Sequence, residues 1–460
     1  MITRTDLLRT LHEDVRAAAR ARAKGEAPPP LSRKRNIRAR LHARLPEHVL
    51  TLLRLAGRVG ERMEVSAFVV GGFVRDLLLG RSNLDVDLVI EGDGIAFARA
   101  LAQEIRAKVT VHDRFGTAIL VLPDGYKLDI ATARTEYYED PTALPTVERS
   151  SIKKDLFRRD FTINALAVRL NAGRFGELID FYGGQRDLKE KTIRVLQGLS
   201  FVEDPTRVFR AIRFEQRFGF RLGQETLALI KGAVGMDLFR RLSPSRLCRE
   251  LVLLLSEDEP RKAVARLGEL GLLRCIHPAL TWSPQLGALL KGVEDSLGWY
   301  RLLYVDREME PWPVYLMALL DCVPGRAVGE TLRRLQVPGR QAEKVKSAHL
   351  TSNKIVQRLG KRPPLRPAEV FRLLEERSDE ALLFLMAKAT SEPAKRRVSA
   401  YLTTYRYVKP TLRGRDLKSM GIKPGPIFKK ILARLRDARL NGEVQTVAEE
   451  RDIAKRLASR

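Results

Sequence analysis

Apolar and polar positions follow two different periods in two parts of the chain. Between about residues 45 and 196 the pattern is that of short strands, in the runs AFVV, LDVDLVI, KVTVHD, AILVLP, KLDIATA and INALAVRL. Helical stretches such as GIAFARALAQEI are mixed among these runs. Strands and helices in one segment predict an α/β or α+β domain over residues 45–196.

The pattern from Phe201 onward is almost wholly helical. Apolar residues recur at three- and four-residue steps in VEDPTRVFRAIRFEQRFGF, RLCRELVLLL and RKAVARLGELGLL. Near the end of the chain, a Gly/Pro turn separates two amphipathic segments in RGRDLKSMGIKPGPIFKKILARLRDARLNGEV. We therefore expect helical regions over residues 197–320 and 321–460.

The first 44 residues have almost no apolar periodicity. A proline run interrupts dense positive charge in RAAARARAKGEAPPPLSRKRNIRARLHAR. Residues 1–44 are accordingly predicted to be a basic arm or linker.

The composition points to a large, basic protein. A chain of 460 residues with 44% apolar residues exceeds the size of one hydrophobic core and predicts several domains. Its formal net charge of +27 predicts a polyanionic partner, which is usually nucleic acid, with an anionic membrane as the competing partner. Because no apolar run has membrane-spanning length and no signal-peptide pattern is present, we expect a cytoplasmic protein.

Cysteine and histidine usage bears on the kind of metal site. The three cysteines, Cys248, Cys275 and Cys322, are widely spaced and odd in number, which suits buried thiols in a reducing compartment better than disulfides or a zinc site. The six histidines are scattered. Any bound metal is therefore expected to have oxygen ligands.

Two aspartates separated by one residue stand out in LDVDLVI. On a strand, Asp85 and Asp87 would share one face, where their charges repel unless a divalent cation such as Mg²⁺ binds between them. Two ions held in this way can serve the transfer of a phosphate group. An exposed edge strand with two solvated aspartates is the alternative. A calcium loop is excluded, because Leu88 and Val89 occupy positions that need further oxygen ligands.

The segment before this pair has the features of a phosphate site. The strand AFVV stops at Gly71-Gly72 and a helix begins with FVRDLLLG, so that N–H groups at the helix start can face an anion. Arg75 in the first turn could reach the same anion. The alternative is a tight strand-to-helix turn in which Arg75 pairs with Asp76 or another carboxylate. The P-loop and dinucleotide-binding glycine patterns are absent.

The segment EDPTR suits the reading of a nucleotide base. Asp204 can accept a hydrogen bond from the exocyclic amine of adenine or cytosine, and Arg207 can donate to the neighbouring ring nitrogen. Guanine and uracil present the opposite pattern. The alternatives are an aspartate that caps a helix starting near Pro205, and a solvated basic face formed by Arg207 with the arginines that follow.

Five segments in order resemble the motifs of one family. They are GGFVRDLLLGRSNLDVDLVI, RRDFTINALA, DFYGGQRDLKEKTIR, EDPTRVFRAIRF and LSPSRLCREL. Together these segments, which span about residues 68–251, are similar to those of the class II tRNA nucleotidyltransferase and bacterial poly(A) polymerase family. The resemblance implies an α+β fold, with a polymerase-β-like head containing a small mixed sheet, followed by an all-α neck, body and tail.

The resemblance also implies roles for individual residues. Metal would be held by Asp85 and Asp87. The triphosphate would contact the Gly71-Gly72 turn, Arg75 and Arg159. The ribose would contact Asp160 and Asn164. The base would contact Asp204 and Arg207, and Arg210 and Arg213 would also contact the nucleotide. Asp129 in KLDIATA is a candidate third catalytic carboxylate, or else a solvated strand residue. Judged locally, residues 158–160 could equally form a surface salt-bridge cluster and Asn164 a turn.

The reaction implied is the attack of an RNA 3′ hydroxyl on the α-phosphorus of ATP or CTP, with two Mg²⁺ ions. The tail resembles those of tRNA-directed members, which favours tRNA over general polyadenylation. Two segments resemble the A-adding subgroup, namely DLVIEGDGIAFARALA and FRAIRFEQRFGF. The start of the chain, MITRTDLLRTLHED, is similar to the last helix of a CBS domain, which precedes the head in long A-adding proteins. These resemblances favour the A-adding subgroup and a truncated chain. Complete CCA-adding and CC-adding enzymes stay as alternatives, with poly(A) polymerase less favoured.

Two further interpretations concern the base-selecting loop and a different class of function. Residues 133–151 are interpreted as the loop that sets base preference in this family. A non-catalytic RNA-binding protein on the same scaffold would be expected to lack the aspartate pair, and both residues are present. A helical RNA chaperone would suit the charge, but it would leave the ordered motifs unexplained.

Overall fold

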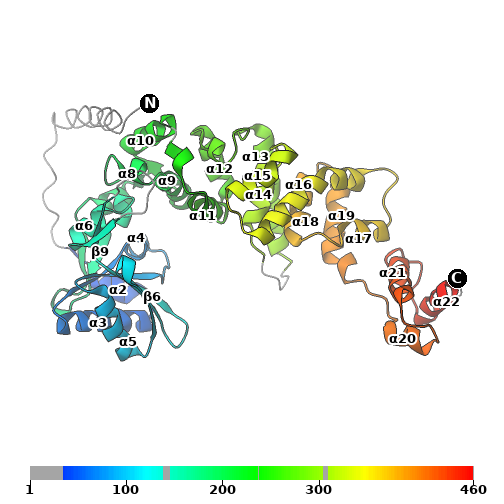
Figure 1. The fold of residues 1–460 in the computed structure, drawn as a ribbon, viewed down its shortest axis with the longest axis horizontal. Coiled ribbons are helices and arrows are strands. Elements are labelled where there is room, and N and C mark those ends of the chain that lie inside the picture. Colours follow the sequence, from blue (N-terminus) through cyan, green and yellow to red (C-terminus); the bar gives the residue numbers. More distant parts are fainter. Residues whose placement is uncertain (1–34, 138–145, 237, 304–308, 459–460) are drawn as a thin grey trace. The chain divides into compact units, whose positions relative to one another are not determined.

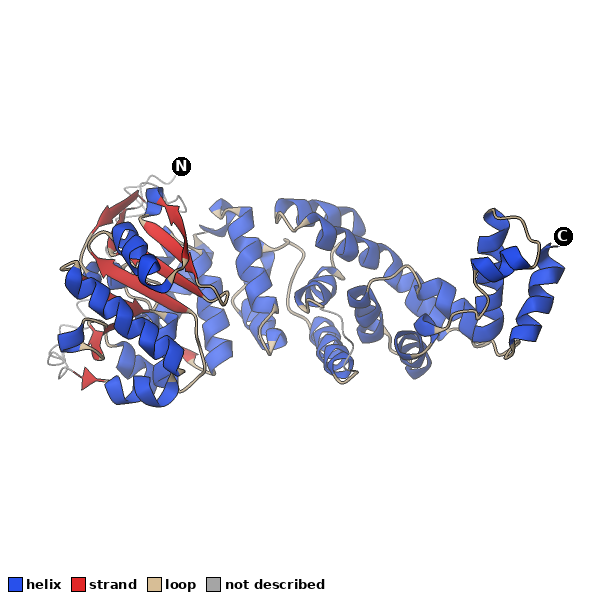
Figure 2. Cartoon of the chain, turned by 90° about the horizontal axis from the view of Figure 1, so that it is seen from below, coloured by secondary structure: helices blue, strands red, loops and turns tan. Residues whose placement is uncertain are grey.

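The chain folds into two compact units, with the boundary between Leu242 and Ser243. The computed structural model describes residues 35–137, 146–236, 238–303 and 309–458. Within these ranges all strands belong to the first unit and the second unit is helical (Figures 1 and 2). The α+β class with a helical remainder is therefore confirmed. Residues 1–34, with the segment similar to a CBS helix, lie outside the described residues.

A mixed sheet of eight strands forms the centre of the first unit. Its spatial order is β1 (Arg35–Asn36), β10 (Glu177–Asp180), β9 (Leu166–Arg169), β2 (Ser66–Val70), β3 (Val86–Glu91), β6 (Lys127–Thr132), β5 (Thr117–Val121) and β4 (Lys108–His112). The pairing of β3 with β6 is parallel, and the other pairings are antiparallel. A parallel central pair matters because it places the same ends of two strands side by side.

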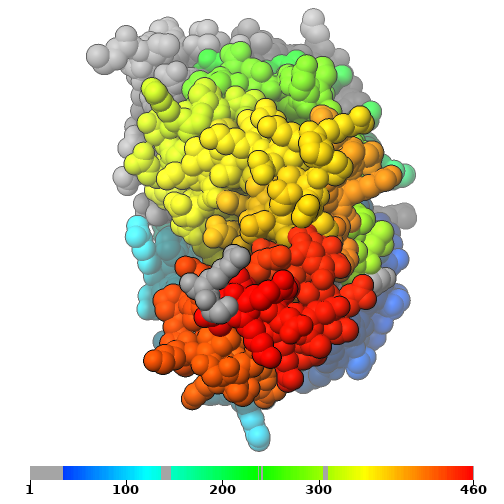
Figure 3. Space-filling view, turned by 90° about the vertical axis from the view of Figure 1, so that its right-hand side faces the viewer, coloured from blue at the N-terminus to red at the C-terminus, as the bar shows by residue number. Residues whose placement is uncertain are grey.

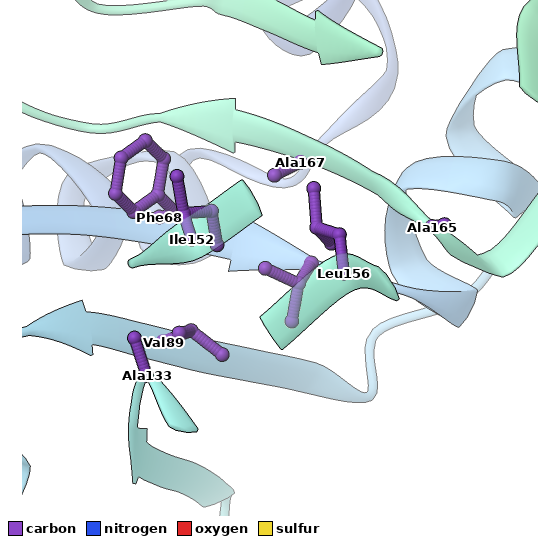
Figure 4. Close-up of a cluster of buried hydrophobic side chains, with 8 residues drawn as sticks. Phe68, Val89, Ala133, Ile152, Leu156, Ala165 and Ala167 are labelled. Carbon is purple, nitrogen blue, oxygen red and sulfur yellow. The ribbon is translucent and has the colours of Figure 1, made fainter. Parts of the chain in front are cut away.

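Different helices pack against the two faces of this sheet. Helix α3 (Glu47–Arg62) packs on β2 from one side, where Gly60 lies against Ala67, and α5 (Gly94–Ile105) packs on β4, β5 and β6. The opposite face carries Phe68 and Val89, which pack with α6 (Ile152–Phe157) in one buried cluster (Figure 4). Because side chains alternate along a strand, Asp87 shares the face of Val89.

Short elements complete the first unit. Its remaining helices are α2 (Arg38–Arg44), α4 (Gly72–Leu79), α7 (Gly184–Lys189), α8 (Ser200–Glu203), α9 (Thr206–Phe218) and α10 (Gln224–Gly235), with single 3₁₀ turns such as Thr162–Asn164. Strands β7 (Arg134–Tyr137) and β8 (Thr146–Arg149) form a hairpin, and β11 (Thr192–Ile193) pairs in parallel with β12 (Arg221–Leu222).

Two findings were not foreseen from the pattern. Residues 35–44, within the segment interpreted as an arm, form β1 and α2, and β1 extends the sheet by pairing with β10. β12 falls inside a region with helical patterning. Strands of two residues such as β1 and β12 are too short to leave a periodic signal.

The second unit consists of helices. They are α11 (Pro244–Leu255), α12 (Pro260–Glu269), α13 (Pro284–Arg301), α14 (Trp312–Leu320), α15 (Gly325–Arg334), α16 (Gly339–Gly360), α17 (Pro367–Leu374), α18 (Asp379–Lys388), α19 (Glu392–Thr403), α20 (Gly414–Ser419), α21 (Pro426–Leu440) and α22 (Val447–Ala458). The last three bury their own apolar cluster, with Leu417, Ile431 and Leu435 at its centre. Figure 3 looks onto this end, where their residues form the orange and red surface. Among the helices described, none has both the length and the apolar character needed to cross a membrane.

Candidate active site

The predicted aspartate pair lies at the start of β3. The strand begins at Val86, so Asp85 precedes it by one residue and is exposed, whereas the pattern predicted both aspartates within the strand. The reason is local: the N–H of Asp85 donates to Oδ1 of Asn83 at 2.9 Å, which makes a turn before the ladder starts. In the parallel register of β3 with β6, Asp87 is directly opposite Asp129.

These three carboxylates affect one another electrostatically. Burial raises the pKa of Asp87 to about 6; Arg159 opposes this shift, and Asp85 and Asp129 add to it. Burial, followed by the charge of Asp85, also raises the pKa of Asp129. Negative charge is thus concentrated on one face of the sheet, and a bound divalent cation would relieve the repulsion.

The donor set fits a cation that takes some ligands from its substrate. Across the described residues, no group of three or more His, Cys, Asp or Glu side chains is arranged to hold a metal ion by itself. Asp85 and Asp87 would supply only part of a ligand set, and carboxylate oxygens are donors that Mg²⁺ accepts together with phosphate oxygens and water; their role as metal ligands stays a prediction. A third ligand from Asp129 stays a prediction.

The Gly71-Gly72 turn and Arg159 form a candidate anion site next to the pair. Gly71 has φ +72° and ψ −130°, a conformation that favours glycine, and α4 starts at the following residue. A Cβ on Gly71 would lie only 2.8 Å from Nη1 of Arg159. Nε of Arg159 is buried and has no hydrogen-bond partner among the described residues, so this guanidinium has capacity for an anion.

Asp155 holds Arg159 in place, and the sequence analysis did not identify it. Its fully buried carboxylate accepts from Arg158 at 2.7 Å and from Arg159 at 3.1 Å. Although burial opposes ionisation, the charges of Arg159 and Arg158 lower the pKa of Asp155. A signal was available, since an aspartate three and four residues before two arginines on a helix can pair with both.

Arg75 takes the arrangement that the sequence analysis gave as the alternative. Its guanidinium is buried and donates to both oxygens of Asp76 at 2.8 Å, while Nη1 donates to Asn164 at 2.6 Å. The same group lies 5.3 Å and 4.7 Å from the ring centroids of Phe214 and Phe218 on α9. A contact between Arg75 and a triphosphate stays a prediction.

The two residues assigned to the ribose are bonded to each other and to α9. Asn164 donates to Asp160 at 2.9 Å, and Arg210 donates twice to the other carboxylate oxygen of Asp160, at 2.9 and 2.7 Å. Burial opposes ionisation, but Arg210 and then Asn164 hold the pKa of Asp160 at about 2. Asp160 is therefore ionised at neutral pH and fixed in orientation.

The residues assigned to the base lie at the start of α9. Asp204 ends α8 and accepts from the backbone N–H of Thr206 at 3.0 Å, but the N-cap position of α9 is Pro205, one residue later than its sequence context predicted. Arg207 is buried and donates to Ser200 and to the carbonyl oxygen of Arg158, both at 2.9 Å. These contacts orient the guanidinium before any nucleotide binds.

Arg213 and the loop interpreted as setting base preference are the last features predicted from the sequence. Arg213 is buried, with its guanidinium 5.0 Å from the Phe214 ring. Strands β7 and β8 frame the loop, whose residues 138–145 lie outside the described part of the chain. All the site residues named from the sequence belong to the first unit.

Comparison with known proteins decides the family. The poly A polymerase head domain matches residues 67–194, and a domain described as a probable RNA and SrmB-binding site of polymerase A matches residues 219–282. The A-adding tRNA nucleotidyltransferase of Halalkalibacterium halodurans is 32% identical, over 89% of this chain and 94% of that protein. The chain belongs to the tRNA nucleotidyltransferase family.

Other members of the tRNA nucleotidyltransferase family add detail. The A-adding tRNA nucleotidyltransferase of Geobacter sulfurreducens is 47% identical over the whole of this chain, which spans 52% of that relative's length. The structure of the Thermotoga maritima CCA-adding enzyme complexed with tRNA-CCA superimposes with a TM-score of 0.77 at 33% identity, covering 93% of this chain and 99% of that one. The family identified from the sequence motifs is thus confirmed.

Proposed function

We propose that this chain completes the 3′ end of tRNA by adding the terminal A from ATP, without a nucleic-acid template. The observation that carries the proposal is the electrostatic contact between the aspartates at the start of β3 and Arg159, whose guanidinium lies against the Gly71-Gly72 turn and whose Nε has no partner among the described residues. Family relatives named as A-adding support the choice of nucleotide.

The first unit has the groups that this transfer needs. Asp85 and Asp87 would hold Mg²⁺, which, when bound, makes the tRNA 3′ hydroxyl a better nucleophile and neutralises charge on the phosphates. Arg159 and the backbone N–H groups at the start of α4 would bind the triphosphate and orient its α-phosphorus for in-line attack, with pyrophosphate departing. Catalysis then consists mainly of positioning and charge neutralisation.

Nucleotide choice would depend on α9. A carboxylate at Asp204 and a guanidinium at Arg207 match the donor and acceptor edge of adenine, and Arg207 is already oriented by Ser200. The partners of Asp160 leave its carboxylate ionised, so it can accept a hydrogen bond from a ribose hydroxyl. Each of these roles rests on the family motif together with the placement of the residue beside its neighbours.

The tRNA would be bound through phosphate contacts. The formal net charge of +27 favours a polyanionic partner, and the complex of the Thermotoga maritima enzyme shows that this family fold can bind tRNA. We propose that the helical second unit contributes much of this binding.

The test is incorporation of labelled nucleotide by the purified 460-residue chain. We expect AMP to be added to tRNA ending in CC, with Mg²⁺ present, and Asp85→Asn to abolish the addition. Asp113→Asn, which changes an exposed carboxylate of the same unit, is the matched control and should keep wild-type activity. A wild-type chain that extends none of the tRNAs offered would overturn the proposal.

The same assay separates the alternatives. Transfer of CMP to tRNA lacking all three terminal residues would identify a complete CCA-adding or a CC-adding enzyme, and the two differ in whether A follows. Repeated addition of AMP beyond a single residue would indicate a poly(A) polymerase. tRNA binding without any transfer would indicate a non-catalytic RNA-binding protein on this scaffold.

A further inference from the structure

A continuous path of side-chain hydrogen bonds connects the metal-binding end of β3 to α9. We call this path the relay. In order, its members are Asn83, Asp76, Arg75, Asn164, Asp160 and Arg210. Each link measures between 2.6 and 2.9 Å, which is the range of well-formed hydrogen bonds.

Asn83 is the member that meets the aspartate pair. Its Oδ1 accepts from the backbone N–H of Asp85 at 2.9 Å, and its Nδ2 donates to Oδ2 of Asp76 at 2.8 Å. The position of Asp85 thus depends on one side chain that is itself fixed by a buried carboxylate. Neither the family motif nor the sequence analysis assigned a role to Asn83.

The interior of the relay is rigid because its charges are buried and paired. Asp76 and Arg75 have 4% and 6% of their side-chain surface exposed and form a bidentate pair. Asn164 joins Arg75 to Asp160, residues that are far apart in sequence. A buried network in which each member is bonded has few alternative arrangements.

The relay is fixed to α9 at two points, one at its end and one at Arg75. Arg210 donates to Asp160, and the Arg75 guanidinium packs on the rings of Phe214 and Phe218. All three of these α9 residues follow Arg207, the residue assigned to the base. A shift of α9 would therefore be transmitted through hydrogen bonds and ring contacts toward the turn before β3.

We propose that Asn83 is a positioning residue for Asp85, and that through the relay it ties the placement of this metal ligand to the nucleotide-selecting helix. This inference rests on the proposed function. Asn83 does not contact the substrate; it would act by holding the main chain at Asp85, and a displacement of about 1 Å at a catalytic group can lower a rate by about 100-fold.

The first experiment is kinetic. Asn83→Ala should lower kcat for AMP addition by about 10- to 100-fold, because Asp85 is less well placed. KM for ATP should change by less than about threefold, since the Gly71-Gly72 turn and Arg159, which the proposed function places at the triphosphate, make no contact with Asn83 in the relay. The matched control is Asn171→Ala, because Asn171 is also half-buried and also makes two hydrogen bonds at an end of the sheet, to Ala67 and Val65, outside the relay. It should keep wild-type kcat.

A second pair of variants separates the relay from a local turn. Asn83→Asp keeps the oxygen that accepts from Asp85, but it replaces the donor to Asp76 with a second carboxylate oxygen. The relay therefore predicts that Asn83→Asp is as defective as Asn83→Ala. Wild-type kcat in Asn83→Asp would overturn the relay, because only the turn would then matter.

Coupling to α9 is tested by a double-mutant cycle with Arg210→Lys, which keeps the charge but loses the double donation to Asp160. If the relay couples the two ends, the double variant loses much less kcat than the product of the two single effects. Independent effects that multiply would contradict the coupling.

A readout that needs no catalysis keeps this proposal distinct from the proposed function. Hydrogen exchange of a peptide spanning residues 81–87 should be faster in Asn83→Ala than in the wild type or Asn171→Ala, whether or not the chain transfers AMP. Unchanged exchange in that peptide would overturn the positioning role even if the enzyme were active. Absence of wild-type transfer with faster exchange would instead reject only the proposed function.

Discussion

Replacement of Gly71 by alanine tests the anion site most sharply. Gly71 has φ +72° and ψ −130°, and an L-residue forced into such a conformation costs about 1–3 kcal/mol. The new Cβ would also lie 2.8 Å from Nη1 of Arg159, about 0.6 Å closer than the 3.4 Å at which ordinary contact begins. The end of the arginine side chain must therefore move away from the turn.

The size of the functional effect follows from the bond that would be lost. A hydrogen bond to a charged group contributes about 1.5–3 kcal/mol, which corresponds to about 10- to 150-fold in an equilibrium or rate constant. We therefore expect Gly71→Ala to lower kcat/KM for ATP by about 10- to 100-fold, mostly through a higher KM. Steady-state addition of AMP to saturating tRNA ending in CC gives this number.

Two comparisons make the result interpretable. Gly173→Ala is the control, because a Cβ there meets no atom within 4 Å, and its kcat/KM should stay near wild type. Hydrogen exchange of peptides from β2 and β3 shows whether the Gly71 variant keeps its sheet. A folded Gly71→Ala chain with kcat/KM within twofold of wild type would refute the placement of the triphosphate beside Arg159.

Three further predictions concern stability and metal. The pKa of Asp160 is lowered from 3.8 to about 2, so its ionisation contributes about 2 kcal/mol to the first unit above pH 4, and this contribution is lost as the pH falls toward 2. The difference in exchange protection between wild type and Asp160→Asn should thus shrink over that pH range, and a constant difference would contradict the shift. Glu450→Gln should destabilise α20–α22 by about 2–4 kcal/mol, because the fully buried carboxylate accepts from the N–H groups of Thr411 and Leu412 and from Arg439. Hydrogen exchange of residues 410–458 measures this loss of stability. The control is Asp452→Asn, which changes an exposed residue of α22. Removal of divalent ions with a chelator should abolish AMP transfer and leave far-UV circular dichroism unchanged, and unfolding on chelation would show a structural metal instead.

The sequence predicted those elements that have a long periodic pattern or that depend only on residues near them in the chain. The strand that carries Asp87, the strand-to-helix turn at Gly71-Gly72 and, to within one residue, the start of α9 after Asp204 follow from periodicity, glycine placement and proline placement. The exact start of β3 did not follow, because it depends on a hydrogen bond from Asp85 to a side chain, Asn83.

Contacts between distant segments could not be predicted from local patterns. The register that sets Asp87 opposite Asp129 arises from a parallel pairing of residues that are 42 positions apart in the sequence. Arg75 is another case. Its sequence context allowed pairing with an anion or with Asp76, whereas its bond to Asn164, 89 positions away, and its packing on Phe214 and Phe218 could not be read from local sequence. Long-range pairing of this kind is fixed by the tertiary structure.

Unfolding of the two units can be followed separately in such experiments. Trp282, Trp299 and Trp312, the three tryptophans of the chain, all belong to the second unit. Tryptophan fluorescence therefore reports on the helical unit, and peptide-resolved hydrogen exchange is the measurement for the first unit. Variants of the candidate site should change exchange in the first unit without shifting the fluorescence transition.

The proposed metal-binding role of Asp85 and Asp87 is tested by the single-turnover rate of AMP transfer in Asp85→Asn and Asp87→Asn. These substitutions keep the size of each side chain and remove the charge that would hold the divalent ions. We expect a loss of more than about 1,000-fold in both variants with tRNA binding retained, since several kcal/mol of charge stabilisation would be removed. Transfer within tenfold of wild type by either variant would contradict it.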